Sequence, residues 1–483
     1  MVKSNDKAKR TVGQQGEGNT GSGKKKEPRI GPSTPVETCS ERITSFGGLI
    51  ALEKLLDLLD FNGVFLNGFI PPRRRPRLGH HSMVKGILIL LFVGFQRIQH
   101  FMHIRFDPLV TGILGVGVMP AVSTFWRCLR SYGAEQERSV VEMMARLRER
   151  VWSLVGLQFR TVHIDMDTTV GTVYGDIEGA RKGHNRKNRG KKGLRPVLCF
   201  IRETREYLCG MQRKGQTISR KEVASLIGKF RTLLPSCVTR IIVRADCEFN
   251  GWESVEACSK AGIFFIFASQ KCSLPLSKCR WYRWKGLEYT ECRYKAKDWK
   301  EAQRYVVVRK RKENGEENLI EEDNYTYRQF VTNLPFRPHK IVTRYDGRAD
   351  VENQIAAAQR EGIIAIPSKS LETNRAFFQI VMLAFNLWRW MKLLAGHQQT
   401  QQDRKTEQKQ EKVPPSEIVL ETVQVTRLKI LFLAAKLTFH SNRKHVYFSI
   451  HDSRTQPLLE FTQYLDARRK QPKPWNNTIR AGP

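Results

Sequence analysis

The stretch RTVHIDMDTT, residues 160–169, alternates apolar and polar side chains and carries two aspartates near its end. Alternation with a period of two predicts a β-strand with one buried face. On such a strand His163, Asp165 and Asp167 share a face, so alternation alone does not choose between the two aspartates. Asp167 lies nearer the carboxyl end of the strand, where open α/β sheets place their active sites. We therefore expect Asp167 to face a functional site and Asp165 to support it.

The segments after this strand predict an α/β core. Strands are predicted at residues 160–167, 195–203, 207–213, 239–246 and 262–269. Helices are predicted at residues 219–234, 251–262, 345–362 and 374–395. The first of these helices begins with a capping box formed by Ser219 and Glu222. Three strands, a helix, a strand, a helix and a strand is the order of an RNase H-like core, an order that other α/β folds share.

The net charge of the chain is strongly positive. Its 483 residues include 82 Lys and Arg against 47 Asp and Glu, which gives a formal net charge of +35 and a pI near 10.0. Such a field attracts polyanions, and nucleic acid is the commonest polyanion that a large protein meets. The basic residues occur along the whole chain, so a basic tail alone does not account for them. We therefore expect a nucleic-acid partner.

The sequence carries no recognisable signal for membrane insertion or export. The most apolar run, GILILLFVGF at residues 86–95, is about ten residues long, whereas a membrane-spanning helix needs about 20. The first residues have no apolar core of the kind that a signal peptide requires. The ten cysteines form no C-x-x-C pair and lie mostly in apolar or strand-like stretches, as reduced core cysteines do. We expect no membrane partner and a cytoplasmic location.

Composition and pattern divide the chain into seven segments. The first is poor in large apolar residues and is predicted to be disordered, and the sixth is a polar linker ending in Pro-Pro. The predicted segments are a basic tail (1–42), a helical DNA-binding region (43–155), the first part of the core (156–268), a β-rich insertion (269–335), the second part of the core (336–397), a linker (398–420) and a small C-terminal cap (421–483).

Three acidic residues stand where strands and a helix would deliver them to one site. Asp167 and Asp246 end two predicted strands, and Glu352 lies on the helix after the insertion. On that helix Tyr345, Arg348 and Glu352 share one face within about 60°. An acid, a guanidinium and a phenol on one face suit phosphate chemistry, because the acid can hold a metal and the other two can bind phosphate oxygens. Nearby acids are alternatives for the same roles: Asp165, Glu248, Asp346 and Asp350.

Other residues are candidates for contact with nucleic acid. Pro120 and Ser123 predict a helix start before residues 124–132, which would place Arg127 and Arg130 on a helix that enters a DNA groove. An ordinary packed helix of a bundle is the alternative. In the insertion Trp281, Trp284 and Trp299 could stack on a displaced base, and core packing is equally compatible with each of them.

A strongly basic stretch lies beside the first strand. Residues 181–195, RKGHNRKNRGKKGLR, contain eight basic residues in fifteen. The stretch is either a solvated charged loop or a clamp for phosphates, and its place beside the predicted site favours the clamp. The basic residues that we expect to bind DNA are Arg181, Lys182, Arg186, Lys187, Arg189, Lys191 and Lys192.

The spacing of Tyr345, Arg348 and Glu352 resembles the Y-x-x-R-x-x-x-E signature of DDE insertion-sequence transposases. Further passages make the chain similar to the insertion-sequence-1380 branch of that group: HIDMDTT, YGDIEGARKGHN, VRAD, FVTNLP and LAFNL. Any one passage is a weak signal, but their order and spacing together are specific. The resemblance runs from about Gly47 to the C-terminal segment and so covers most of the chain.

The resemblance implies an RNase H-like catalytic core with a β-rich insertion before the helix that bears the glutamate. It implies that Asp167, Asp246 and Glu352 hold two Mg²⁺ ions, for which Mn²⁺ can substitute. It also implies a homodimer that binds double-stranded DNA, both the inverted-repeat ends of the element and the target, within the bacterial nucleoid. A nuclease without strand transfer is a rival interpretation. A catalytically inactive or domesticated DNA-binding descendant is another, against which the three intact acids argue.

Overall fold

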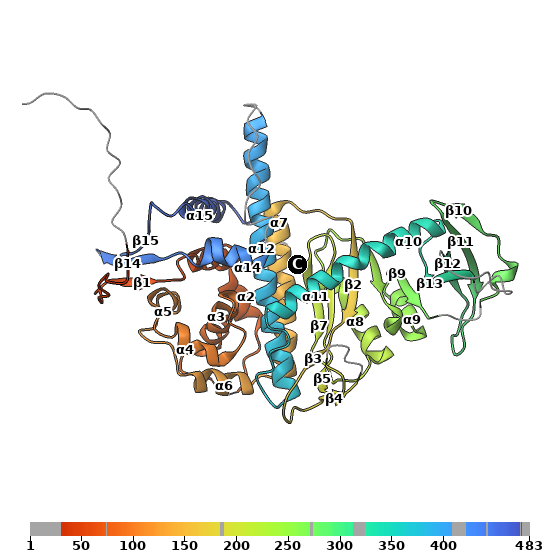
Figure 1. Ribbon diagram of the computed structural model, residues 1–483, viewed down its shortest axis with the longest axis horizontal. Helices are drawn as coiled ribbons and strands as arrows, with labels where there is room; N and C mark the ends of the chain where they lie inside the picture. Colours follow the sequence, from red (N-terminus) through yellow and green to blue (C-terminus); the bar gives the residue numbers. More distant parts are fainter. Residues whose placement is uncertain are drawn as a thin grey trace, which may run out of the picture. The chain divides into compact units, whose positions relative to one another are not determined.

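The computed structural model places residues 160–169 inside a nine-stranded mixed sheet (Figure 1). In their order across the sheet the strands are β10 (Tyr282–Trp284), β11 (Leu287–Tyr294), β12 (Gln303–Arg311), β13 (Tyr325–Thr332), β9 (Phe264–Ser269), β8 (Arg240–Ala245), β2 (Thr161–Thr168), β6 (Val197–Ile201) and β7 (Glu206–Met211). Strands β2, β8 and β9 run parallel, while β6 and β7 form an antiparallel extension beside β2. The predicted strand positions and their order along the chain are confirmed.

The structure describes residues 30–73, 75–183, 188–270, 274–312, 324–407, 422–440, 443–473 and 475. Contacts divide the chain into two units, residues 1–41 and 42–483, and the helices and strands of the described residues belong to the second unit. No helix of the described residues is both long and apolar enough to span a bilayer.

The two faces of β2 have different environments, as its alternating sequence predicts. Val162, Ile164 and Met166 are fully buried in an apolar cluster with helices α8 (Arg220–Leu233) and α9 (Trp252–Lys260). Burial of such side chains is worth roughly 1.5–3 kcal/mol each. Helix α8 begins with the predicted capping box, in which the Ser219 side chain accepts from the backbone of Glu222. The opposite face of β2 carries the polar side chains.

The second face of the sheet is covered by the helices that follow the insertion. These helices are α10 (Pro338–Asp346), the 3-10 turn η5 (Gly347–Ala349), α11 (Asp350–Arg360) and α12 (Leu371–Glu407). Leu198, Phe200 and Tyr207 of the sheet belong to the same apolar cluster as α12. Helix α12 also continues through residues 398–407, where the sequence predicted a linker. Gln, Lys and Glu favour helix, which explains why these polar residues extend it.

The β-rich insertion is part of the main sheet. Strand β13 pairs in antiparallel fashion with β9, so that Gln329 lies opposite Ser269. Strands β12, β11 and β10 follow outward from β13. Val306 and Phe330 pack against Ile341 of α10 in a separate apolar cluster. The insertion separates β9 from α10 along the chain, and its strands extend the sheet of the core.

The N-terminal helices and the C-terminal segment share one apolar cluster and one small sheet. The first group comprises α1 (Leu49–Leu58), α2 (Phe61–Gly68), α3 (Gly79–Phe92), η1 (Ile98–His100), α4 (Phe101–Ile104), α5 (Pro108–Leu114), α6 (Val122–Arg130) and α7 (Ala134–Val155). The second comprises α14 (Val423–Thr426), the π-helical turn η6 (Arg427–Leu431), β14 (Ala435–His440), β15 (Arg443–Phe448) and α15 (Thr455–Lys470). Strand β1 (Arg42–Thr44) pairs with β14, which joins the two groups.

A buried carboxylate ties β7 to helices α7 and α12. Glu206, which is fully buried, accepts hydrogen bonds from Arg148 at 2.9 Å, Trp152 at 2.7 Å and Trp390 at 2.8 Å. Arg148 also donates to the carbonyl oxygens of Tyr207 at 2.7 Å and of a residue at the end of α8. Because β7 is the last strand of the sheet, these contacts satisfy polar groups that an open edge would leave unpaired.

Replacement of Glu206 by Gln should lower the free energy of unfolding by about 3–5 kcal/mol, because the buried Arg148 then lacks its counter-charge. The measurement is urea denaturation monitored by tryptophan fluorescence. Glu149→Gln, an exposed change on the same helix α7, is the control and should alter stability by no more than about 0.5 kcal/mol. Equal urea midpoints for the two variants would contradict this role of Glu206.

Candidate active site

The carboxyl ends of two neighbouring parallel strands bring Asp167 and Asp246 together. Asp165 on β2 and Arg244 on β8 lie directly opposite each other in the ladder. Because side chains alternate between faces along a strand, the aspartates two residues further on leave the same face as that pair. Asp167 is the penultimate residue of β2, and Asp246 follows the last residue of β8. The predicted meeting of these two strand ends is therefore observed.

The carboxylate of Asp167 is largely enclosed. Its Oδ2 lies 2.9 Å from Nη2 of Arg348, and its Oδ1 accepts a hydrogen bond from the backbone N–H of Thr168 at 2.7 Å. Burial raises the pKa of Asp167 to about 6, and the charge of Arg348 opposes this rise. The negative charges of Asp246 and Glu352 add to it. The site therefore gathers negative charge around one arginine.

The carboxylate of Asp246 caps the turn that follows β8. Its Oδ1 accepts a hydrogen bond of 3.0 Å from the backbone N–H of Glu248, within the 3-10 turn η2 (Cys247–Phe249). Burial raises the pKa of Asp246, and the charge of Arg348 opposes the rise. In both aspartates, then, a backbone N–H of the following residues holds one carboxylate oxygen and so orients the group.

Arg348 is the cation at the centre of this site. Its Nη2 donates to the carbonyl oxygen of Met166 at 3.0 Å as well as contacting Asp167. Burial disfavours the charge of Arg348, but the neighbouring Asp167, Tyr345 and Asp246 outweigh burial and raise its pKa. Tyr345 packs its ring 4.7 Å from that of Phe330, and burial raises the pKa of its phenol. The structure thus brings the predicted tyrosine, arginine and aspartates together.

The helix that carries these residues is broken, although the sequence predicted one helix over residues 345–362. Tyr345 lies near the end of α10, Arg348 lies in η5, and Glu352 lies in the first turn of α11. Figure 1 shows α10 and α11 following one another across the sheet. Arg244 explains the break, because it donates to the carbonyl oxygens of Arg344 and Gly347, the latter at 3.4 Å. Carbonyls bound in this way favour a tighter turn over continued α-helix.

The pair Asp165–Arg244 is fully buried below the site. Each oxygen of Asp165 lies 2.6 Å from a different nitrogen of Arg244, in a bidentate arrangement. Burial raises the pKa of Asp165, and the hydrogen bonds from Arg244 oppose the rise. A β-carbon added at Gly347 would approach Nη1 of Arg244 to 3.0 Å, so the glycine leaves room for the guanidinium. Asp165 therefore acts on the site through Arg244, which holds the turn that carries Arg348.

Glu352 is exposed to solvent on α11, at the border of the site. Its charge contributes to the raised pKa of Asp167, which places the two carboxylates within electrostatic reach. Helix α11 is tied to the end of β2 by Gln359, whose Nε2 donates to Oγ1 of Thr169 at 2.6 Å. Among the described residues, no three His, Cys, Asp or Glu side chains are close enough together to hold a metal ion. The three predicted carboxylates thus border one site without forming a closed cage.

A second ion pair beside the site was not predicted. Oε2 of Glu248 lies 2.5 Å from Nη2 of Arg195 and accepts a hydrogen bond from Thr168 at 3.2 Å. Its Oε1 accepts from the backbone N–H of Ile218 at 3.2 Å. Glu248, named above as an alternative acid, is therefore engaged by structural partners. The sequence offered one indication of this ion pair, because Arg195, the last basic residue of the stretch 181–195, lies just before β6.

The arginines of α6 lie outside the carboxylate cluster. Arg127 and Arg130 are exposed and border a groove of about 780 Å³ together with Trp126 and Lys369. The other face of α6, which includes Phe125, packs in the core. The helix is thus packed on one side and presents its arginines on the other.

The basic stretch 181–195 forms part of a small sheet. Its strands, in order, are β3 (Gly171–Thr172), β5 (Lys192–Leu194) and β4 (Arg181–Lys182). Exposed basic residues gather on it: Arg181, Lys182, Arg189, Lys191 and Lys192. Arg186 and Lys187, also predicted to bind DNA, lie outside the described residues.

Trp299 is a core residue in the structure. It is 8% exposed and packs its ring 6.1 Å from that of Trp252 and 6.4 Å from that of Tyr305. A ring enclosed by two aromatic neighbours offers no free face to a nucleobase. The predicted stacking role is therefore not supported by this geometry, and core packing, the alternative given above, describes the residue.

Comparison with known proteins places the chain in a family. No curated protein matches it. The cryo-EM structure of the piggyBac transposase synaptic complex with hairpin DNA is similar at 11% identity and a TM-score of 0.38, over 90% of this chain and 85% of that one. The Mos1 transposase paired-end complex with left transposon end is similar at 11% identity and a TM-score of 0.16, over 39% of this chain and 59% of that one. Both likenesses are too distant to carry an argument. The family model for the transposase DDE domain, group 1, matches residues 29–469, and the chain therefore belongs to that family.

Proposed function

We propose that this chain is an active DNA transposase that binds transposon ends, cleaves phosphodiesters and transfers the ends into target DNA. Membership of the DDE transposase family supports the reaction class. The observation that carries the proposal is the placement of Asp167 and Asp246 at neighbouring strand ends, with Arg348 2.9 Å from one of them. Acidic side chains that face a buried guanidinium at a strand edge suit a reaction at a phosphate.

The donor chemistry of this site fits a divalent ion. Asp167 and Asp246 offer hard carboxylate oxygens on one sheet face, and Glu352 borders them from α11. Such oxygens suit Mg²⁺, for which Mn²⁺ can substitute. We propose that these three residues hold two ions, which when bound would activate the attacking oxygen and stabilise the leaving one. Glu352 must approach the aspartates to complete this set, because the described residues do not form a three-ligand group.

Within the site, the other residues have roles that follow from their contacts. Arg348 balances the charge of Asp167 in the structure, and its guanidinium suits a phosphate oxygen when DNA is present. The phenol of Tyr345 offers a further hydrogen bond beside it. Thr168 and Glu248 supply backbone N–H groups that orient the two aspartates. Asp165 is a positioning residue that acts through Arg244.

The same proposal includes the fold of the core, the branch of the family, the nucleic-acid partner and the assembly. The order of strands and helices supports an RNase H-like core, and the quoted passages support the insertion-sequence-1380 branch. The partner is double-stranded DNA, bound with the help of the exposed basic residues of α6 and of the β4–β5 hairpin. We further propose that the chain acts as a homodimer on paired ends in the bacterial nucleoid.

A catalytically inactive descendant is the second candidate, and the site variants distinguish the two. Asp246→Asn and Glu352→Gln should each abolish cleavage while leaving DNA binding nearly intact, because each removes a carboxylate charge but keeps the side-chain shape. The measurement is a nicking assay with Mg²⁺ beside a gel shift, on a duplex that contains the DNA flanking the gene. Cleavage by a variant at the wild-type rate would remove that residue from the active site, and an inert wild type would favour the second candidate.

Substitution of the two aspartates of β2 should affect cleavage to different extents. Asp167→Asn should abolish cleavage, whereas Asp165→Asn should reduce it about 10–100-fold, as loss of an outer partner typically does. Asp165→Asn should also lower the melting temperature, because the buried Arg244 loses its counter-charge. Rates are compared at saturating Mg²⁺ and again in Mn²⁺. An inactive Asp165→Asn beside a partly active Asp167→Asn would reverse the assignment.

DNA binding should weaken steeply with salt. If six or more phosphates are neutralised, the affinity should fall by about 10³ or more between 50 and 200 mM salt. The measurement is fluorescence anisotropy of a labelled duplex at several NaCl concentrations. A flat response would mean that the net charge of +35 serves a purpose other than DNA binding.

A further inference from the structure

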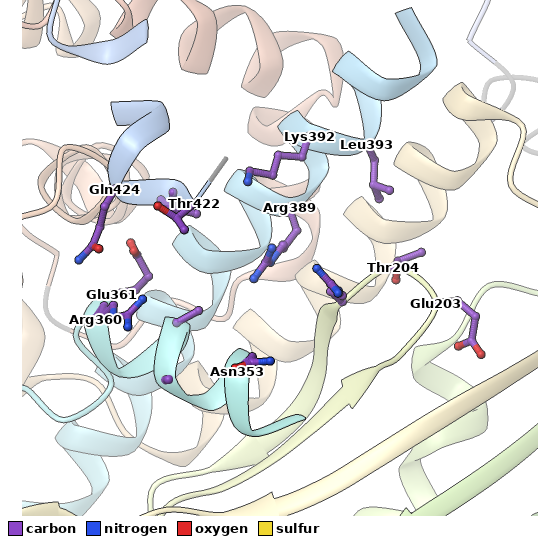
Figure 2. Close-up of a pocket in the computed structure, with 14 residues that line it drawn as sticks. Glu203, Thr204, Asn353, Arg360, Glu361, Arg389, Lys392, Leu393, Thr422 and Gln424 are labelled. Carbon is purple, nitrogen blue, oxygen red and sulfur yellow. The ribbon is translucent and has the colours of Figure 1, made fainter. Parts of the chain in front are cut away.

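A pocket of about 520 Å³ lies beside α11 (Figure 2). Its walls come from α11, α12, the turn between β6 and β7, and the start of α14. None of the site residues named so far lines it. Its charged lining consists of four cations and two carboxylates: Arg205, Arg360, Arg389, Lys392, Glu203 and Glu361.

Both carboxylates of this pocket already have cationic or hydrogen-bonding partners. Oε1 of Glu203 lies 2.7 Å from Nδ1 of His163, and Oε2 accepts from the backbone N–H of the same residue at 3.0 Å. Glu361 forms a buried bidentate pair with Arg427. Arg205 is also paired, with Asp350, but the lining still carries more cations than carboxylates and therefore favours an anion.

Two buried donors of the pocket have no hydrogen-bond partner among the described residues. They are Nε of Arg389 and Oγ1 of Thr204, a residue that is only 6% exposed. Figure 2 shows them on different walls, Arg389 on α12 and Thr204 on the β6–β7 turn. Burial lowers the pKa of Arg389, and the charge of Arg205 adds to this effect. A buried donor without a partner costs roughly 1–3 kcal/mol, so a ligand acceptor toward which either side chain could turn would relieve that cost.

The turn that carries Thr204 holds the next residue in an unfavourable conformation. Arg205 has a φ of 57°, in the left-handed region, which costs a residue other than glycine about 1–2 kcal/mol. Its guanidinium contacts Asp350, at the start of α11, at 2.9 Å. Glycine would adopt this φ without strain. The strained turn therefore holds a cation at the rim of the pocket.

The pocket and the carboxylate site share helix α11. Asn353, the residue after Glu352, lines it, and so does Arg360. Eight residues separate Glu352 from Arg360, which is about 12 Å along the helix axis. A DNA strand that reacts at the carboxylates and then follows α11 would therefore carry its next phosphates along the cations of the pocket.

We propose that this pocket binds a backbone phosphate of the DNA strand that leads to the carboxylate site. The proposal rests on the DNA-transposase function proposed above. A phosphate supplies acceptor oxygens for Arg389 and Thr204 and negative charge for the surrounding cations. Free phosphate has the same chemistry, so the test must separate it from DNA.

The first test compares Arg389→Gln with the wild type, using a short fluorescein-labelled duplex and anisotropy at several NaCl concentrations. The affinity should fall about tenfold, as expected for a lost hydrogen bond to a charged group. The slope of log affinity against log salt should become shallower by about 0.9, the value for one phosphate. The control is Arg231→Gln, an exposed change on α8 at the opposite face of the sheet, which should alter neither quantity.

The melting temperatures of the variants distinguish a role of Arg389 and Arg205 in ligand binding from a role in stability. Arg389→Gln removes a charge for which burial outweighs the attraction of Asp350 and Glu361, so its melting temperature should equal or exceed that of the wild type. Arg205→Gly relieves the strained φ and should likewise not lower the melting temperature, yet it should weaken duplex binding. Reduced affinity in a variant of undiminished stability supports the proposal.

Three outcomes would overturn it. If the wild type binds the duplex with a steep salt slope and both variants bind identically, the pocket does not contact DNA, while the proposed function stands. If inorganic phosphate raises the melting temperature of the wild type but not of Arg389→Gln, and duplex binding is equal in both, the pocket binds free phosphate. If the wild type does not bind the duplex at all, the proposed function and this inference fall together.

Discussion

The site depends on one buried ion pair, Asp165–Arg244, which joins two neighbouring parallel strands. Each partner is fully buried, and a lone charge at such a depth would cost several kcal/mol, so the pair is stable only when both strands are in register. Arg244 has donors left over, and they reach the carbonyls of Arg344 and Gly347. The same guanidinium therefore sets the strand register and the place where the covering helix breaks.

The geometry of the candidate site follows from that register. Asp167 and Asp246 each lie two residues beyond a member of the pair, so they emerge side by side at the strand ends. A slip of one residue would turn one of them to the face that packs against α8 and α9. The break after α10 lets Arg348 in η5 reach both Asp167 and the carbonyl of Met166. In a continuous helix, the carbonyls that Arg244 binds would accept helical hydrogen bonds instead.

The sequence predicts the parts of this arrangement that are local. Alternation places Asp165 and Asp167 on one face of a strand, and the capping box at Ser219 marks the start of α8, as observed. The break at Gly347 was not predicted, because its cause, Arg244, lies about 100 residues earlier and reaches it only in the folded chain. The joining of the insertion to the main sheet escaped prediction for the same reason, since strand pairing between β13 and β9 depends on non-local contacts. One overlooked signal was Arg244 itself, a charged residue directly after three apolar residues of its strand, which requires a partner.

An active site built from carboxylates faces a physical conflict when its substrate is a polyanion. Asp167, Asp246 and Glu352 repel phosphate until cations offset their charge, and the raised pKa of Asp167 reflects that crowding in addition to burial. Within the site, Arg348 offsets the charge of Asp167, and Arg195 offsets the charge of Glu248. Pairs of this kind neutralise the site but do not attract a strand. Attraction requires cations that are not paired within the site, and the exposed basic residues of α6 and of the β4–β5 hairpin supply such a field. This separation would let the carboxylates stay close together while cations elsewhere on the surface attract the proposed polyanionic substrate.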